Sequence, residues 1–404
     1  MTKNYLPFAL PQIEDEEIAE VIDTLKGGWL TTGPKTHAFE VEFAKVIGAS
    51  YALAVNSATA GLHLALEAIG LQRDERVITT AWTFTATAEV IRYLDAHPIF
   101  VDIDPYTLNI DPERIAEQID KHNRRLDKIR AILPVHFGGQ ACDMQAIMDL
   151  ATTRDLRVVE DAAHAFPATV TSRSASNSNI KHRIIGTVAD ATVFSFYVTK
   201  TIATGEGGMV TTEDEEIADR IRLMRLHGIN RDVWNRYTSN KPSWYYEVVA
   251  PGFKYNLSDI ASAIGLQQLK KAMKFQDRRE EIANAYSAAF SQFSQLQVPA
   301  HINPTETHSW HLYVLRLNLE TLTIDRDRFI EEMSARGIGC SVHFIPLHLH
   351  PYWRDRYQLT PDMLPVATNE FKRVVSLPVY PKMTDEDVYR VIEAATDIVK
   401  KFKR

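Results

Sequence analysis

The sequence predicts an α/β protein: a large domain with a mainly parallel sheet covered by helices, followed by a smaller C-terminal α+β domain. Short apolar runs of strand length alternate with segments of helical periodicity through most of the 404 residues. Such alternation is typical of parallel strands in one sheet with helices on both faces. Further along, the order changes to strand, helix, strand, strand, helix, so we expect the domains to span 1–270 and 271–404.

The chain begins with two predicted helices. Residues 14–26 form a helix with Ile18, Ile22 and Leu25 on one face, ended by a pair of glycines. A loop that carries Trp29 follows, and a second amphipathic helix leads into the first strand. In the large domain we expect strands at 51–55, 76–80, 98–102, 129–137, 157–160, 191–196 and 209–212, with helices at 85–94, 112–122 and 144–154 between them.

The smaller domain is entered through a long helical tract that begins after Ser258 and reaches Phe290. It has predicted strands at 310–317, 338–344 and 374–379 and a helix at 326–336. Thr384 and Asp387 have capping-box spacing at the start of a last helix.

Two long segments interrupt the pattern. Residues 169–181 are rich in Ser and Asn and predict a surface loop. Residues 229–250 contain Trp234, Tyr237, Trp244, Tyr245 and Tyr246, and so many aromatic side chains indicate burial, preferably against another subunit.

Composition excludes several classes of protein. The net charge is −7 and no long basic block occurs, so we expect no nucleic-acid partner. Two cysteines exclude a disulfide framework and suit a reducing compartment. No apolar run approaches the roughly 18 residues of a membrane span, and acidic residues come too early for a signal peptide. We therefore expect a soluble cytoplasmic protein without a membrane partner.

In parallel sheets, ligands bind beyond the carboxyl ends of the strands. This rule places the regions of Ser57, Asp161 and Lys200 around one crevice. Residues 56–61 lie where a strand turns into a helix, and free amides there suit a phosphate, although a plain Ser N-cap is an alternative. Lys200 follows the buried strand 191–196, where desolvation lowers an ammonium pKa and favours a nucleophilic amine. A solvated lysine is the alternative.

Asp161 ends a strand and can pair with a cationic ring nitrogen. A structural Asp at a helix N-cap competes with this interpretation. A metal site of Asp161 and His164 would need further ligands, which are absent at metal-like spacing. The His-rich segment 343–350 is a proline-bounded loop, better explained by substrate contact or packing than by metal, so we expect no metal. A phosphate cup, a strand-end Asp and a strand-end Lys together are the parts that hold pyridoxal 5′-phosphate (PLP).

Several ordered motifs resemble the DegT-type sugar aminotransferases, which are fold-type I PLP enzymes. They extend over almost the whole chain and include Ser57-Ala58-Thr59-Ala60-Gly61-Leu62, Glu160-Asp161-Ala162-Ala163-His164-Ala165, Phe194-Ser195-Phe196 with Lys200, Gly205-Glu206-Gly207-Gly208 and Tyr255-Asn256-Leu257-Ser258-Asp259.

The resemblance implies a role for each matching residue. Lys200 would be the Schiff-base lysine and proton carrier, Asp161 would pair with the pyridinium nitrogen, and His164 would lie near the phenolic oxygen. The remaining roles are ring stacking by Phe84, phosphate binding by Ala58, Thr59 and Ser195, a phosphate contact from the neighbouring subunit of a homodimer by Asn256, and substrate contact by His348 and Trp29.

The resemblance also implies a reaction. Some relatives that dehydrate sugars carry histidine at the lysine position, and Lys200 therefore favours amination. The expected reaction moves an amino group from L-glutamate to a keto group of a nucleotide-linked sugar. A cyclitol ketone as acceptor, or a non-catalytic regulator that retains the pocket, are the alternatives.

Overall fold

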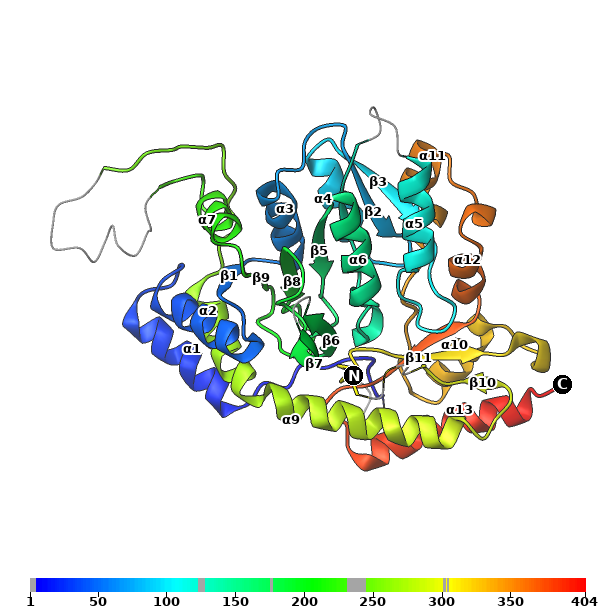
Figure 1. Cartoon of the computed structure of the whole chain (residues 1–404). Helices are drawn as coiled ribbons and strands as arrows, with labels where there is room; N and C mark the ends of the chain where they lie inside the picture. The colour runs from blue at the N-terminus through cyan, green and yellow to red at the C-terminus, as the bar shows by residue number, and fades with distance from the viewer. Residues whose placement is uncertain (1–4, 123–127, 175–176, 231–244, 301–302, 304) are drawn as a thin grey trace.

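The computed structural model describes residues 5–122, 128–174, 177–230, 245–300, 303 and 305–404. In this part of the chain a seven-stranded sheet has the order β1-β9-β8-β5-β4-β2-β3 (Figure 1). β9 is antiparallel to both neighbours and the other strands are parallel, which confirms the predicted sheet. The strands are β1 (Tyr51–Val55), β2 (Arg76–Thr80), β3 (His97–Val101), β4 (Ile129–Leu133), β5 (Arg157–Asp161), β8 (Ala191–Ser195) and β9 (Gly208–Thr212).

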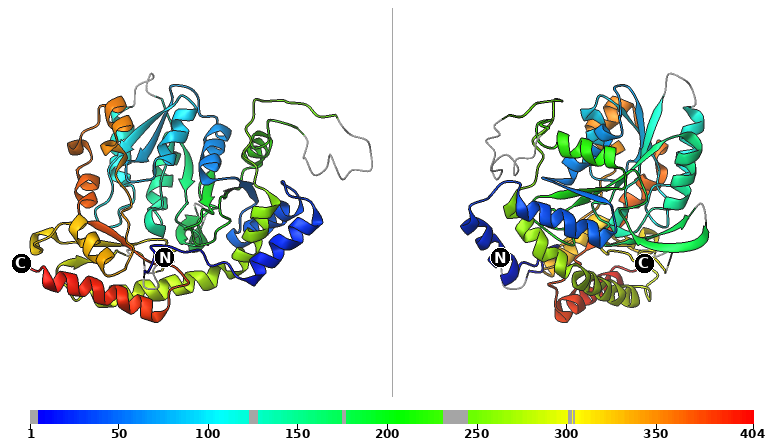
Figure 2. Two further views of the ribbon diagram at one scale, coloured as in Figure 1. Left: turned by 180° about the vertical axis from the view of Figure 1, so that it is seen from behind. Right: turned by 60° about the vertical axis from the view of Figure 1, so that its left-hand side comes forward.

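Helices cover both faces of this sheet, as the views in Figure 1 and Figure 2 show. Because side chains alternate along a strand, Val158 and Phe194 enter one core while Val159 and Val193 enter the other. The first core is closed by α2 (Pro34–Ile47), α5 (Pro112–Lys121), α6 (Met144–Arg154) and the first part of α9 (Asp259–Phe290). The second is closed by α3 (Ala58–Ala68), α4 (Ala86–Tyr93) and α7 (Glu215–Met224).

A smaller antiparallel sheet has the order β10-β11-β12. Its core includes Tyr286 and Phe290 from the second part of α9, so this one helix contributes to both units. Residue 270 lies within α9, and the division at 270/271 stays a prediction. The elements of this region are β10 (Leu296–Gln297), β11 (Tyr313–Leu317), β12 (Val374–Leu377), α10 (Arg326–Ala335), α11 (Pro351–Tyr357), α12 (Pro365–Phe371) and α13 (Asp385–Lys401).

The capping box predicted for the last helix is confirmed, because Thr384 and Asp387 exchange side-chain and backbone hydrogen bonds of 3.2 Å at the start of α13. The strand predicted at 338–344 is wrong. Ile338 and Ser341 make only single bridges, to Leu6 and Ser376.

The surface loop predicted at 169–181 is also wrong. A two-stranded ribbon of β6 (Thr169–Ser174) and β7 (Asn177–Ile184) occupies this region. Val170 lies in the first core and Ile184 packs against it, whereas most other residues of the two strands are polar and give little strand signal. The amide N of Thr171 donates to the Glu306 carboxylate at 2.7 Å and helps to anchor it.

Helix α1 (Asp15–Gly27) packs through a polar face and leaves its apolar face outside. Glu17 is 1% exposed and accepts a 2.8 Å hydrogen bond from Gln268 of α9. Ile18, Ile22 and Leu25 are 51%, 44% and 52% exposed. The predicted apolar face therefore exists but does not enter the core of this chain.

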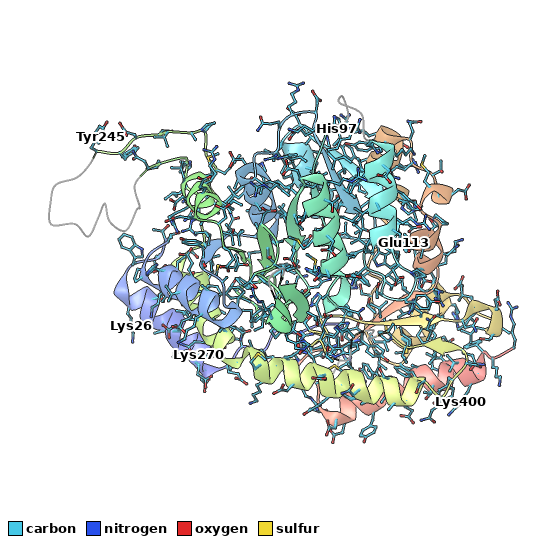
Figure 3. All side chains as sticks on the ribbon, in the orientation of Figure 1. Lys26, His97, Glu113, Tyr245, Lys270 and Lys400 are labelled. Atoms are coloured by element: carbon cyan, nitrogen blue, oxygen red, sulfur yellow. The ribbon has the colours of Figure 1, made fainter. Side chains whose placement is uncertain are left out.

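Only the two ends of the aromatic segment, residues 229–230 and 245–250, belong to the described part of the chain. Trp234, Tyr237 and Trp244 lie outside the described residues. Tyr245 and Tyr246 are 60% and 46% exposed, and Tyr245 stands at the edge of the molecule in Figure 3. Over the described ranges, none of the helices is both long enough and apolar enough to cross a bilayer.

Candidate active site

A cavity of about 600 Å³ lies where β1, β2, β5 and β8 end at one edge of the sheet. Its volume falls in the range of about 300–1,000 Å³ that is typical of small-molecule sites. The structure brings seven of the predicted site residues together in its lining, which are Ala58, Thr59, Phe84, Asp161, His164, Ser195 and Lys200.

The start of α3 forms one end of the cavity. Ser57 caps the helix by accepting a 3.1 Å hydrogen bond from the amide N of Ala60, and Ala58 and Thr59 provide the first turn. Amides of a first turn have no intrahelical acceptor and attract anions. β9 comes so close that a Cβ at Gly208 would lie 2.8 Å from the amide N of Ala58. Ser195 adds a hydroxyl from the end of β8.

Asp161 is a buried carboxylate beneath the cavity. It accepts hydrogen bonds from Thr87 Oγ1 at 2.8 Å and from the amide N of Ala163 at 3.1 Å. Burial raises the pKa of Asp161, against the opposing effect of these two hydrogen bonds and of the Lys200 charge. A cation within contact distance would relieve this cost, and a protonated ring nitrogen is such a cation.

Lys200 reaches the same cavity from the turn after β8. Burial lowers the pKa of Lys200 to about 8, although the negative charge of Asp161 opposes this shift. Its Nζ lies 3.4 Å from His311 Nε2. At pH 7 such a pKa leaves roughly a tenth of the amine uncharged, far more than for an exposed lysine.

Aromatic rings form the walls of the cavity. His164 lies against His311 with ring centroids 4.3 Å apart and stacks on Phe344 at 5.7 Å. Phe84 remains 61% exposed in the chain, on the cavity wall near Phe344. An exposed phenyl ring in a concave site is suited to covering a flat heterocycle.

His311 was not singled out from the sequence, although it contacts Lys200. The only signal was a histidine in a run predicted as strand. His343, which belongs to the His-rich loop, also lines the cavity, and its Nδ1 lies 2.9 Å from Ser376 Oγ.

Three predicted residues lie away from this cavity. His348 is fully buried, with Nε2 2.8 Å from Thr368 Oγ1. Trp29 donates from Nε1 to the Thr32 carbonyl at 3.0 Å. Asn256 donates to Thr32 Oγ1 at 2.6 Å and lies beside β1, at the edge of the sheet.

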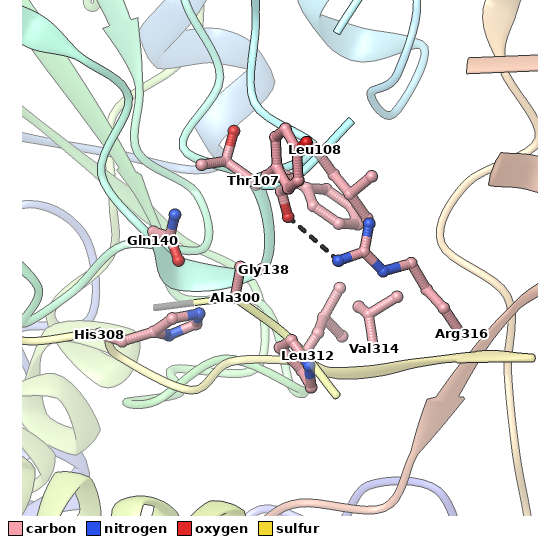
Figure 4. A pocket seen from close by; sticks show the side chains of 12 residues that line it. Thr107, Leu108, Gly138, Gln140, Ala300, His308, Leu312, Val314 and Arg316 are labelled. Atoms are coloured by element: carbon pink, nitrogen blue, oxygen red, sulfur yellow. Dashed lines mark hydrogen bonds between the residues drawn. The ribbon is translucent and has the colours of Figure 1, made fainter. Parts of the chain in front are cut away.

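A second hollow, of about 20 Å³, separates the loop after β3 from β11 (Figure 4). Arg316 closes it and donates hydrogen bonds to the carbonyls of Pro105 and Tyr106 at 2.6 and 3.1 Å. Arg316 thus joins β11 to the loop after β3, and it is not among the residues that line the larger cavity. Within the described ranges, no group of three His, Cys, Asp or Glu residues could hold a metal ion.

The profile of the DegT/DnrJ/EryC1/StrS aminotransferase family matches residues 11–396. The chain belongs to this family. It is 48% identical over 398 residues to the spore coat polysaccharide biosynthesis protein SpsC of Bacillus subtilis, and the match covers 98% of each chain.

Solved structures agree with this assignment. Spr1654 of Streptococcus pneumoniae, in its PMP form, is 31% identical with a TM-score of 0.88 over 98% of this chain and 99% of that one. Helicobacter pylori PseC, an aminotransferase involved in the biosynthesis of pseudoaminic acid, is 27% identical with a TM-score of 0.86 over 99% and 100%. The protein is therefore an enzyme of the DegT-type sugar aminotransferases, and its cofactor is PLP.

The residues of this chain fit that cofactor. One end of the cavity has the first-turn amides of α3 and the Ser195 hydroxyl. Its lining also includes the desolvated carboxylate of Asp161 and the exposed phenyl ring of Phe84. Lys200 lines the same cavity.

Proposed function

We propose that the protein transfers an amino group from L-glutamate to a keto group of a nucleotide-linked sugar. The observation that supports this most is a desolvated lysine and a desolvated carboxylate on one cavity, Lys200 and Asp161, in a chain of aminotransferase sequence. Lysine rather than histidine at position 200 favours amination over dehydration.

Each end of the cofactor has residues suited to hold it. The first-turn amides of Ala58 and Thr59, with Ser195, would bind its phosphate. Asp161 would pair with the ring nitrogen, and Phe84 would cover the ring. His164 would lie near the phenolic oxygen. When bound, PLP supplies the electron sink that makes transamination possible.

Lys200 would move the proton. Within each half of the transfer, its uncharged amine would take a proton from the carbon that loses one, and the ammonium so formed would deliver that proton to the carbon that gains one. A base is most efficient when its pKa lies near the working pH, and a pKa of about 8 meets this condition. Asp161 stays ionised beside a ring cation because their attraction offsets the cost of burial.

The cavity wall supports a sugar as acceptor. Ser341, His343 and Tyr197 line it with neutral polar groups, and Phe344 adds an aromatic face. Such groups hydrogen-bond hydroxyls and stack on sugar rings. Contact by His348 or Trp29 remains a prediction. The names of SpsC and PseC, which concern polysaccharide and pseudoaminic acid biosynthesis, support the same substrate class.

The active enzyme would be a homodimer with shared active sites, working in the cytoplasm. The exposed Tyr245 and Tyr246 and the position of Asn256 at the sheet edge support a contact with a second copy. The two free cysteines suit a reducing compartment.

Cofactor attachment is tested on the purified protein with PLP. We expect a visible absorbance band that borohydride removes, with the cofactor mass then found on the peptide containing Lys200. Lys200→Ala should bind PLP without this attachment. A labelled peptide that lacks Lys200 would contradict the assignment.

Product analysis tests the substrate. With L-glutamate as donor, we expect 2-oxoglutarate to form together with an amino sugar when nucleotide-linked ketosugars are supplied. A panel that includes free ketosugars and inosose separates the alternatives. Turnover of inosose alone would replace the nucleotide-sugar proposal with the cyclitol one.

A further inference from the structure

His311 is the one imidazole recorded at hydrogen-bond distance from Lys200 in the described part of the chain. Its Nε2 lies 3.4 Å from Lys200 Nζ, and the ring lines the cavity. The side chain is 6% exposed, and its Nδ1 has no hydrogen-bond partner among the described residues. A buried polar atom without a partner is costly, and a role at a reacting site is one of the reasons why such an atom persists.

The backbone around His311 is held from two sides. Ser309 Oγ donates to the His164 carbonyl at 2.6 Å, and the amide N of Leu312 donates to the Gly138 carbonyl at 3.0 Å. These bonds fix the segment to the loops after β4 and β5, so that the ring of His311 rests against the ring of His164.

Helix α9 supports the same segment from the other side. Arg279 Nη1 donates to the carbonyls of Trp310 and Val379 at 3.2 and 2.7 Å, and Gln276 Nε2 donates to the carbonyl of His308 at 2.6 Å. Trp310 has φ +47°, a left-handed conformation that is unfavourable for a non-glycine residue. The surrounding bonds maintain this conformation, which sets the direction of the next residue, His311.

The charge environment keeps the imidazole neutral. Burial lowers the pKa of His311 well below its usual value, and the nearby positive charge of Lys200 adds to this shift. A neutral ring that accepts at Nε2 carries its proton at Nδ1. The titratable groups that act on Lys200 from neighbouring elements are Asp161 and Arg279, and those that act on His311, besides Lys200, are His164, Arg279 and His343.

We propose that His311 is a positioning residue for Lys200. Its Nε2 accepts a hydrogen bond from the lysine nitrogen whenever that nitrogen is not covalently held by the cofactor. One N–H direction is thereby fixed, so that the remaining lone pair or proton points toward the reacting carbon. The hydrogen bond also stabilises the ammonium form of Lys200, which exists after the amine has accepted a proton and before it donates that proton.

Titration of Lys200 in the cofactor-free protein tests this role without turnover. Trace labelling with acetic anhydride across pH, read by mass spectrometry of the Lys200 peptide, gives the pKa of its amine. His311→Phe removes the acceptor and should lower this pKa by about one unit, because a net hydrogen bond is worth roughly 1 kcal/mol. His311→Gln, whose carbonyl can take the place of Nε2, should restore it.

His343→Phe is the matched control, because this imidazole lines the same cavity but is bonded to Ser376. It should leave the pKa of Lys200 close to that of the parent protein. If His311→Phe fails to fold, His311→Asn takes its place, since the shorter amide reaches only the position of Nδ1.

Kinetics give a second readout on the PLP-loaded enzyme. His311→Phe should lower kcat about tenfold with little change in KM, and His311→Gln should recover most of the loss. An unshifted Lys200 pKa in both acceptor-free variants, or a Gln variant that behaves like Phe, would overturn the proposal.

Discussion

At the scale of single residues, two neighbouring carboxylates in β5 have separate tasks because strand side chains alternate between faces. Glu160 accepts hydrogen bonds from Thr192 Oγ1 at 2.9 Å and pairs with His136 at 2.7 Å, inside the sheet core. Asp161 points to the opposite face and lines the cavity. Because neighbouring residues of a strand point to opposite faces, only Asp161 of the two carboxylates is directed toward the cofactor.

Asp161→Asn should therefore impair catalysis without unfolding the protein. The amide cannot hold the ring nitrogen as a cation, and loss of about 2.7 kcal/mol of transition-state stabilisation corresponds to about a hundredfold in kcat. Steady-state kinetics with saturating PLP measure it. Glu160→Gln is the adjacent control: it should lower thermal stability while kcat falls far less. Equal kcat losses in both variants would contradict the separation.

The pH profile should report Lys200. As a base it works uncharged, and its pKa of about 8 lies far below that of an exposed lysine. Below this value the uncharged fraction falls tenfold per pH unit, so the rate of the half-reaction that begins with free Lys200 should rise with pH and level off above about 8. Stopped-flow absorbance over a pH series measures it. A profile flat between about pH 6 and 9 would exclude this titration.

At the scale of elements, the close approach of β9 to the first turn of α3 shapes the phosphate end of the cavity. Gly208→Ala would place a Cβ 2.8 Å from the amide N of Ala58 and from the Phe194 carbonyl. Backbone would have to move, at a cost of about 1–3 kcal/mol. We expect weaker PLP binding by equilibrium titration and a lower melting temperature.

Gly27→Ala provides the matched control. A Cβ at Gly27 meets nothing within 4 Å, and the residue ends α1 without a left-handed φ. This variant should keep parental PLP affinity and melting temperature. If Gly208→Ala binds PLP as tightly as Gly27→Ala does, the close approach is not part of the phosphate site.

Much of the architecture could be predicted from the sequence, because buried strands and amphipathic helices leave periodic patterns. The predicted strand ends near Ser57, Asp161 and Lys200 indicated that the candidate site lies at one edge of this sheet. The ribbon of β6 and β7 was not predicted because most of its residues are polar, so the sequence shows no apolar alternation there. His311 was not predicted as a site residue because it is far from Lys200 in the sequence. A local sequence pattern holds no information about contacts between such distant segments.

At the scale of the whole molecule, two features support the proposed homodimer. The apolar face of α1, with Ile18, Ile22 and Leu25, is exposed, while its polar face packs on α9. Tyr245 and Tyr246 are 60% and 46% exposed in the single chain. Exposed apolar patches of this kind mark contacts between proteins. We expect a dimer in multi-angle light scattering at micromolar concentration.

Complementation would show whether that dimer shares its sites. Asn256 lies beside the edge strand β1, outside its own cavity, bonded to Thr32 and Lys254. If Asn256 serves the partner's phosphate site, Lys200→Ala and Asn256→Ala homodimers are both impaired for different reasons. A mixed dimer then contains one site with Lys200 from one chain and Asn256 from the other.

Equal amounts of the two variants, unfolded and refolded together, should form mixed dimers as half of the population, each with one intact site of two. Because half of the dimers are mixed and each has one intact site of two, activity should recover to about a quarter of that of the parent enzyme. This value follows from the two-fold symmetry of the dimer. Lys200→Ala mixed with the parent enzyme controls for refolding yield. If activity does not recover although native mass spectrometry detects mixed dimers, Asn256 acts in the active site of its own chain.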